Sequence, residues 1–288
     1  MSLNRALEDD HVGGDLRRLF ADIRTSLDLP FVPTVFRLLA AQPGYLKPVW
    51  SDLSHVARSR EFHAAARALE EYALSLVLEP GWRFGDQQKV LAAQKFSLDD
   101  MEALSQLAAV LTRSLAQMSL LTRLMQRGYG GGQKGRVSEA RQASALSRLV
   151  TFNIPSERDA GMRVWLLYSE IKKTTGLRHV TSLFRALSPY PGYLAATWLD
   201  AKKLLTRPDF LRARDEMSRR ISSLMVGLPV KDHRSAVRDL TAHEWRGIEE
   251  IIDSTARFMP PMALIATVWQ RSFPQYAHEL LIRREQAG

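Results

Sequence analysis

Val35 to Asp52 reads VFRLLAAQPGYLKPVWSD, and Leu183 to Asp200 reads LFRALSPYPGYLAATWLD. Sliding the chain against itself by 148 residues aligns the two stretches without a gap, and ten of the 28 positions from 35 to 62 are then identical. Unrelated segments of this length would share about two identities, so the match indicates an internal repeat. The sequence therefore predicts that one structural unit occurs twice in the chain.

The spacing of apolar residues indicates that this unit is helical. From Leu16 to Leu27, and again from Leu104 to Met125, apolar side chains recur three and four positions apart. This spacing places them along one face of an α-helix. Because sustained alternation of apolar and polar residues is absent, we predict an all-α fold built from two tandem helical repeats.

Two helix starts carry capping signals. Ser97 precedes two aspartates, which predicts a helix from about 98 to 127 with a serine cap and acidic residues in its first turn. Thr241 is followed three residues later by Glu244, the pattern of a capping box. The second signal predicts a helix that runs to Phe258.

Proline, glycine and composition mark the boundaries of the repeats. Pro-Gly pairs at 43–44 and 191–192 interrupt helical stretches, so each predicts a corner between two helices. Five glycines lie between positions 128 and 135, followed by a polar, basic run that is typical of a linker. We predict a first repeat over 14–127, a linker over 128–158 and a second repeat over 159–284.

The composition excludes several classes of protein. Of the 288 residues, 45% are hydrophobic and 25% charged, which is typical of a globular chain. There is no cysteine, which excludes disulfides, thiol nucleophiles and thiolate metal sites and is compatible with a reducing cytoplasm. No signal peptide or membrane span is recognisable, so we expect a cytoplasmic location and no membrane contact.

A net charge of +9 could attract nucleic acid, an acidic surface or a small anion. The basic residues are scattered along the chain rather than gathered in one tract, so a nucleic-acid-binding protein remains an alternative that the sequence does not favour. The seven histidines, His179 among them, lack the spacing of a zinc helix, and the glycine cluster lacks the pattern of a phosphate-binding loop. These patterns predict neither a zinc site nor a phosphate-binding loop.

Two copies of one helical unit most simply pack about a pseudo-twofold axis, because each copy then buries the same apolar face against the other. Such an intramolecular pseudo-dimer would place its default ligand site in a cleft on that axis. The shared aromatic residues are expected to rebuild one core twice.

The segment SLDLPFVPTVFRLLAAQPGYLKPVW, which begins at Ser26, resembles the group I or DehI-type 2-haloacid dehalogenases, as does LRHVTSLFRALSPYPGYL, which begins at Leu177. The resemblance implies an all-helical protein of two repeats that hydrolyses D- and L-2-haloalkanoic acids in a pocket between them. In that family an aspartate activates a water molecule, which displaces halide with inversion. The reaction forms no covalent ester and uses no metal or organic cofactor.

When the family's site is aligned with this sequence, the two positions that activate water in the family are occupied by apolar residues. The family's catalytic aspartate corresponds to Leu183. The asparagine that helps to position the water corresponds to Leu115, with Thr112 as a less favoured match. A leucine cannot accept a proton, and none of these residues reproduces a primary amide.

The surrounding pocket positions are partly retained. The family's tryptophan becomes Phe31, a nearby phenylalanine becomes Thr34, and the serine before the aspartate is kept as Ser182. We therefore predict that a substrate-binding pocket is formed by Phe31, Thr34, Leu115, Ser182 and Leu183.

These residues predict a divergent family member that keeps a pocket for a small organic acid and lacks the pair that activates water. Two alternatives stay open besides this hypothesis. One is a working dehalogenase that uses another carboxylate, for which Asp52 and Asp200 are candidates because they recur two residues after each repeated tryptophan. The other is the basic nucleic-acid-binding protein. The resemblance also leaves a homodimer open.

Overall fold

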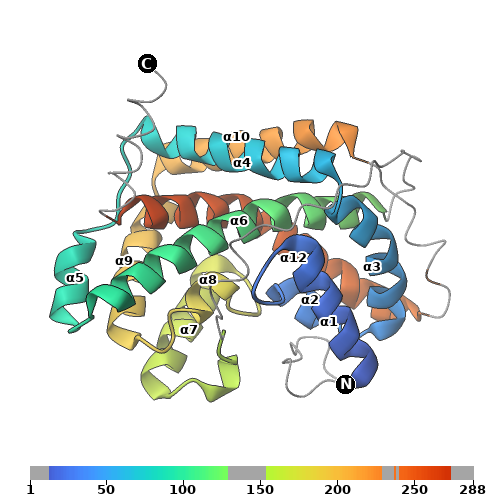
Figure 1. Cartoon of the computed structure of the whole chain (residues 1–288), viewed down its shortest axis with the longest axis horizontal. Helices are drawn as coiled ribbons and strands as arrows, with labels where there is room; N and C mark the ends of the chain where they lie inside the picture. Colours follow the sequence, from blue (N-terminus) through green and yellow to red (C-terminus); the bar gives the residue numbers. More distant parts are fainter. Residues whose placement is uncertain (1–12, 129–153, 229–236, 238–239, 274–288) are drawn as a thin grey trace.

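The structure is a computed structural model that describes residues 13–128, 154–228, 237 and 240–273 (Figure 1). Within these residues every regular element is helical, which confirms the predicted all-α fold class. The α-helices are α1 Gly14–Leu27, α2 Thr34–Leu39, α3 Pro43–Ala57, α4 Arg60–Leu78, α5 Gln87–Ala93, α6 Leu98–Gly128, α7 Met162–Thr175, α8 Ser182–Arg185, α9 Pro191–Leu205, α10 Pro208–Leu224 and α12 Ala242–Arg271. Two short 3-10 helices, η3 Glu157–Asp159 and η4 Met225–Gly227, complete the described part.

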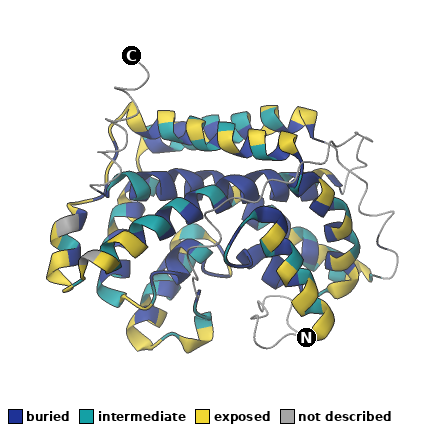
Figure 2. Ribbon diagram, in the orientation of Figure 1, coloured by how far each residue is buried: buried dark blue, intermediate teal, exposed yellow. Residues whose placement is uncertain are grey.

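The helices form layers around a central pair (Figure 1). The two longest helices, α6 and α12, pack against each other along the middle of the molecule, and α4 and α10 cover one side of this pair. On the opposite side lie two groups, one of α1 to α3 and the other of α7 to α9. Figure 2 shows that burial is densest along the central pair, so the core lies where the layers meet.

The predicted helix starts are confirmed. Asp100 donates its backbone N–H to the Ser97 hydroxyl at 3.1 Å, and α6 extends from Leu98 to Gly128 as expected. At the start of α12, the Thr241 and Glu244 side chains bond each other's backbone amides and form the complete capping box. Both caps satisfy backbone donors that a helix leaves unpaired at its first turn.

The predicted end of the last helix is wrong. Instead of ending at Phe258, α12 continues through Pro260 and Pro261 to Arg271. A proline inside a helix costs roughly 3 kcal/mol because it removes a hydrogen bond and crowds the preceding turn. Here every residue from Met259 to Trp269 is buried in the core. Burial of this apolar segment offsets the cost of the two prolines.

The Pro-Gly corners are confirmed. Pro43 and Pro191 each occupy the first position of a helix, where the missing backbone donor costs nothing, and they begin α3 and α9. The preceding residues, Gln42 and Tyr190, have nearly the same backbone angles, with φ of −123° and −122° and ψ of 74° in both. The two quoted segments therefore turn the same corner.

Other boundary predictions fall largely outside the described residues. Most of the predicted linker, residues 129–153, is not described, and neither is the predicted end of the second repeat, residues 274–284. Across the described ranges, none of the helices combines the length and the apolar character that a membrane crossing requires.

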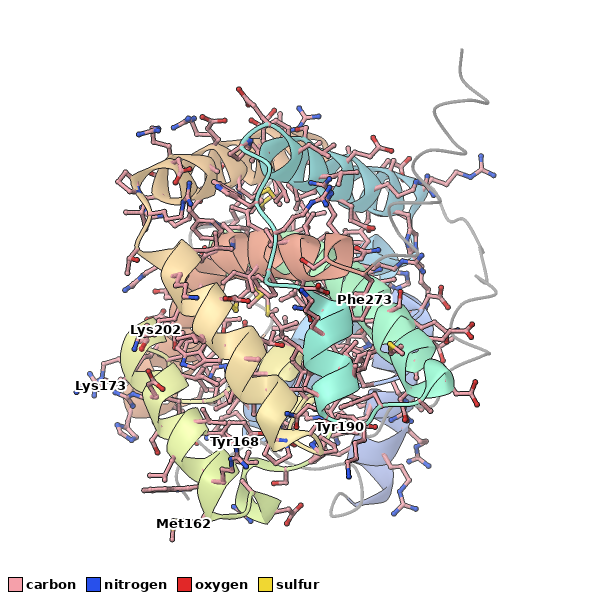
Figure 3. All side chains as sticks on the ribbon, turned by 90° about the vertical axis from the view of Figure 1, so that its left-hand side faces the viewer. Met162, Tyr168, Lys173, Tyr190, Lys202 and Phe273 are labelled. Carbon is pink, nitrogen blue, oxygen red and sulfur yellow. The ribbon has the colours of Figure 1, made fainter. Side chains whose placement is uncertain are left out.

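The outer face of α7 presents apolar side chains to solvent. Met162 is 74% exposed, Trp165 53% and Leu166 56%. Figure 3 shows Met162 at the end of α7 that points away from the body of the molecule.

Glu70, on α4, links stability to pH. Burial raises its pKa to about 7, although Arg113 and Arg67 act to lower it. Because the folded state holds this proton more tightly than the unfolded chain does, the free energy of unfolding falls as pH rises from about 4.5 to 7. Glu70→Gln is therefore expected to stabilise the protein at pH 8, by up to about 3 kcal/mol, and to change little at pH 4.

Urea unfolding of both proteins across this pH range measures the difference. Glu71→Gln, which changes the exposed neighbour, serves as the matched control. The difference in free energy of unfolding between this variant and the unmodified protein should vary much less with pH. A stabilisation by Glu70→Gln that is the same at pH 4 and pH 8 would contradict the assignment.

Candidate functional site: a small cavity between four helices

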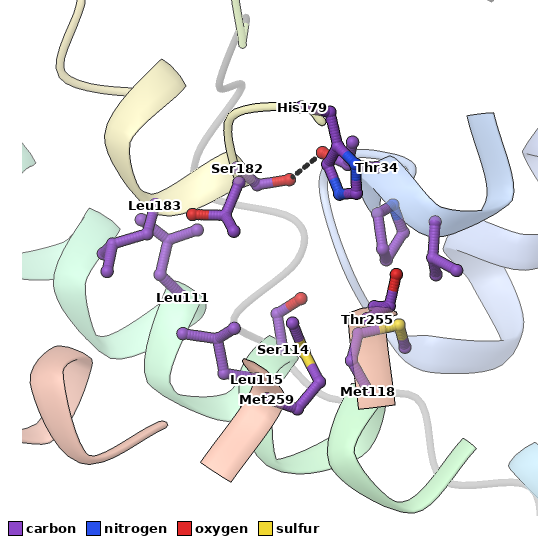
Figure 4. A pocket seen from close by; sticks show the side chains of 13 residues that line it. Thr34, Leu111, Ser114, Leu115, Met118, His179, Ser182, Leu183, Thr255 and Met259 are labelled. Carbon is purple, nitrogen blue, oxygen red and sulfur yellow. Dashed lines mark hydrogen bonds between the residues drawn. The ribbon is translucent and has the colours of Figure 1, made fainter. Parts of the chain in front are cut away.

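A cavity lies where α2, α6, α8 and α12 meet, and the loops that lead into α2 and α8 contribute to its wall (Figure 4). Its free space for the centre of a water molecule is about 30 Å³. A single water needs roughly 10–15 Å³ by this measure, so the cavity has room for a very small ligand or about two waters. The lining residues are Pro33, Thr34, Val35, Leu111, Ser114, Leu115, Met118, His179, Thr181, Ser182, Leu183, Thr255 and Met259.

One end of the cavity is polar. The Thr34 Oγ1 and Ser182 Oγ atoms lie 2.9 Å apart and form a hydrogen bond that joins the start of α2 to the start of α8. In Figure 4 the imidazole ring of His179 lies at the same end as these two hydroxyl groups. This end can therefore hydrogen-bond a polar ligand group.

The remainder of the wall is mainly hydrocarbon. Leu111, Leu115 and Met118 face the cavity from α6, and Met259 faces it from α12. Leu183, which is only 1% exposed, completes this wall from α8. The Thr255 hydroxyl, also in the lining, already donates to the Ile251 carbonyl oxygen at 2.6 Å. The cavity thus suits a ligand with a short apolar body and one polar end.

Within the described part of the lining, His179 is the one titratable side chain, and it is 9% exposed. Burial lowers its pKa to about 4; the Glu157 carboxylate acts to raise the pKa, whereas Arg185 and Lys172 lower it. The imidazole is therefore neutral at pH 7 in the free protein. A neutral imidazole can donate one hydrogen bond and accept another.

Neither a carboxylate nor a primary amide is among the lining residues that the structure describes. Of the two candidate replacement carboxylates, neither Asp52 nor Asp200 lines the cavity. Asp200, on α9, instead accepts a hydrogen bond from the Gly85 backbone at 2.8 Å and pairs with Lys203 at 3.2 Å. Its oxygens support the loop before α5.

The structure brings four of the five predicted binding residues together: Thr34, Leu115, Ser182 and Leu183 all line the cavity. The fifth, Phe31, is 2% exposed and packs in the hydrophobic core without reaching the cavity wall.

Thr112, the less favoured match for the family's asparagine, is not in the lining. Its hydroxyl donates to the Ala108 carbonyl oxygen one turn earlier in α6, at 2.9 Å. Of the two candidate positions, only Leu115 faces the cavity.

His179 was missed as a site residue. Its spacing from other histidines carried no metal signal, and a lone histidine is usually solvated or packed. A usable signal was its place three residues before Ser182, within the segment that carries the family resemblance. In the described ranges, no three histidine, aspartate or glutamate side chains gather as a metal site would require.

Fold and cavity together define a protein that is helical throughout its described regular elements and has a small, mostly apolar cavity between its helices. A family model described as "Halocarboxylic acid dehydrogenase DehI" matches residues 30–183, which is more than half of the sequence. The chain belongs to this DehI-type haloacid dehalogenase family. The matched region contains all five predicted binding residues, four of which line the cavity, and it also contains His179.

The sequence match to an individual protein covers a short segment, whereas the structural matches cover nearly the whole chain. The chain is 30% identical over 69 residues to the (R)-2-haloacid dehalogenase of Pseudomonas putida, and this match covers 24% of the chain and 23% of that relative. A solved D-2-haloacid dehalogenase mutant in complex with D-2-CPA superposes with a TM-score of 0.79 at 17% identity, over 95% of both chains. The D-2-haloacid dehalogenase complex with L-LA also gives a TM-score of 0.79 at 17% identity, over 95% of this chain and 96% of that one. At such identities the structural likeness shows a shared fold.

Proposed function

We propose that this chain is a divergent DehI-type protein that binds a small organic acid between two helical repeats. It does not hydrolyse the carbon–halogen bond of 2-haloacids. The observation that carries this proposal is the composition of the cavity wall, which contains Leu115 and Leu183, the residues that the resemblance aligns with the family's asparagine and aspartate.

The proposed pseudo-dimer is supported by the spacing of the helices. Helices α1 and α7 begin 148 residues apart and have 14 residues each, and α3 and α9 begin 148 residues apart with 15 residues each. The edge-on ring pair Phe36–Trp50 has a centroid distance of 5.2 Å, and its counterpart Phe184–Trp198 has one of 5.3 Å. Repeated bounds and repeated ring packing are what a duplicated unit would produce.

The cavity wall is itself built from matching positions. Thr34 and Ser182, which hydrogen-bond each other, are 148 residues apart, so a pseudo-twofold axis that relates the repeats would pass between their hydroxyl oxygens. Other lining residues pair by the same offset or by the 144-residue offset of the long helices: Pro33 with Thr181, Val35 with Leu183, Leu111 with Thr255 and Leu115 with Met259. An axial cavity of this kind is a common place for a ligand.

The chemistry of the wall supports binding rather than hydrolysis. Displacement of halide by water needs a group that accepts the water's proton, and such general-base assistance contributes roughly a hundred- to ten-thousandfold. Leu183 has no lone pair to offer. The neutral His179 is a weak base, because its pKa of about 4 lies well below the working pH. The wall therefore holds no efficient base.

Purified protein incubated with each enantiomer of 2-chloropropionate is expected to release no chloride above the rate of a buffer blank. An ion-selective electrode or ion chromatography measures the chloride over time, and an active 2-haloacid dehalogenase run in parallel validates the assay.

Rapid release from either enantiomer would overturn the proposal and favour the alternative, a hydrolase with another base. In that case turnover that disappears in Asp200→Asn and survives in Leu183→Ala would identify Asp200 as that base. No chloride from either enantiomer supports the proposed absence of hydrolysis.

A further inference from the structure

We propose that His179 is the carboxylate-binding residue of the cavity and takes up one proton when a small organic acid enters. This inference rests on the proposed function, because it concerns the ligand of the same cavity. It predicts that the anion of the acid is bound together with a proton, so that the complex gains no net charge.

The composition of the cavity wall leaves one residue that could pair with a carboxylate. Among the described residues of the cavity wall there is no lysine and no arginine, and His179 is the one side chain that can become a cation. The imidazole lies at the polar end, beside the hydroxyl groups of Thr34 and Ser182 (Figure 4). A carboxylate directed to this end can accept hydrogen bonds from the imidazole and a hydroxyl, while its short carbon chain lies against the leucines.

The negative charge of the ligand explains why His179 must be protonated. A carboxylate that is buried without a cationic partner loses its hydration, and the hydrogen bonds in the cavity do not compensate for that loss. An imidazolium next to it supplies the missing charge and a strong hydrogen bond. The reverse is also true, because an entering carboxylate favours the protonated form of the histidine.

The charged groups around His179 fit this role. Glu157 faces it from η3, where its carboxylate accepts a hydrogen bond from the Val180 backbone at 2.6 Å and pairs with Lys172 at 3.1 Å. Arg185 on α8 and Lys172 on α7 act to lower the pKa of the imidazole. In the free protein these two cations and burial keep His179 neutral, and they add a positive field that attracts an anion.

Glu157 also holds the loop that carries His179. Its bond to the Val180 amide fixes the residue directly after the histidine, and its bond to Lys172 ties that loop to α7. The imidazole is thus held at the cavity before a ligand arrives, which lowers the entropic cost of binding.

The first experiment compares an acid with its neutral amide. Calorimetric titration with 2-chloropropionate at pH 5, 6, 7 and 8 is expected to show affinity at least about tenfold higher at pH 5 than at pH 7, since binding consumes a proton. Titration with 2-chloropropionamide should change by less than about twofold over the same range. Repeating the acid titration at pH 6 in two buffers of different ionisation enthalpy should show net proton uptake on binding.

Variants assign the effect to one histidine. In His179→Gln the pH dependence of acid binding is expected to disappear. His55→Gln, which changes an exposed histidine on α3 outside the cavity wall, should retain the full dependence. NMR of the wild-type protein provides a measurement that needs no variant: the His179 imidazole should titrate at higher pH when 2-chloropropionate is saturating.

The outcomes separate this inference from the proposed function. If the amide binds in the cavity and the acid binds with no pH dependence, or if His179→Gln keeps the dependence, the role of His179 is wrong while the ligand cavity stands. If neither probe binds at any pH, the proposed function fails and the inference falls with it.

Discussion

The double variant Leu183→Asp, Leu115→Asn is expected to release chloride from 2-chloropropionate at least about a hundredfold faster than the unmodified chain. Both substitutions place their new polar groups in the wall of one cavity, where Leu183 and Leu115 now lie. The aspartate would accept the proton of a water molecule that the asparagine amide positions. The size of the gain follows from the usual contribution of a general base.

The surroundings favour this gain. Leu183 is 1% exposed, and a carboxyl group in its place would have a raised pKa that suits a base working near neutrality. The resemblance aligns Ser182 with the serine that precedes the family's aspartate, and its hydrogen bond to Thr34 joins the starts of α8 and α2. The same burial is expected to cost stability, on the order of 3 kcal/mol, because a polar group replaces packed hydrocarbon.

Chloride assays on the double variant require an isosteric control. Leu183→Asn with Leu115→Asn carries nearly the same volume and polarity into the cavity and lacks the base, so it should remain inactive. Circular dichroism and titration with 2-chloropropionate establish that both proteins are folded and bind. A folded, ligand-binding Asp variant that is no faster than the Asn control would show that position 183 does not correspond to the family's catalytic aspartate.

Trp269→Ala is expected to lower the free energy of unfolding by about 4 kcal/mol. Trp269 lies in the last turn of α12 and is fully buried. Its indole nitrogen donates to the Tyr193 hydroxyl at 2.8 Å, and that hydroxyl donates to Gln87 Oε1 at 2.5 Å. The change opens a cavity where α12, α9 and α5 are joined, and it removes one of the two hydrogen bonds of the buried Tyr193 hydroxyl.

Tyr193→Phe separates packing from hydrogen bonding. It keeps the ring and removes the hydroxyl, so it should cost about 1–3 kcal/mol through the unpaired indole and amide groups. Urea unfolding followed by circular dichroism measures both variants. A loss below about 1 kcal/mol for Trp269→Ala would mean that the contacts of α12 with α9 and α5 contribute little to the fold.

Local sequence patterns were sufficient to predict several of the helix boundaries. The caps at Ser97 and Thr241 and the Pro-Gly corners depend on residues within one or two helical turns, so they could be predicted correctly from the sequence. The end of α12 could not be predicted in this way. Whether a helix continues past Pro260 depends on how deeply the following residues are buried, and burial is decided by other helices.

The candidate site was predictable only in part. Family resemblance selected Thr34, Leu115, Ser182 and Leu183, which the structure brings to one cavity. Phe31, chosen by the same resemblance, packs in the core beside them, since alignment gives a position along the chain and not the direction of a side chain.

By itself, the sequence determined a helical chain with a repeated segment, and the family resemblance predicted leucine at two positions where the family has polar groups. Only the tertiary structure decided that these leucines face one small cavity, that Asp200 lies outside its wall, and that His179 is its titratable residue. The physical reason is the sequence separation of the residues that interact. Helices and caps arise from neighbours a few residues apart, whereas a cavity is made by side chains such as Thr34 and Ser182 that meet only after the chain has folded.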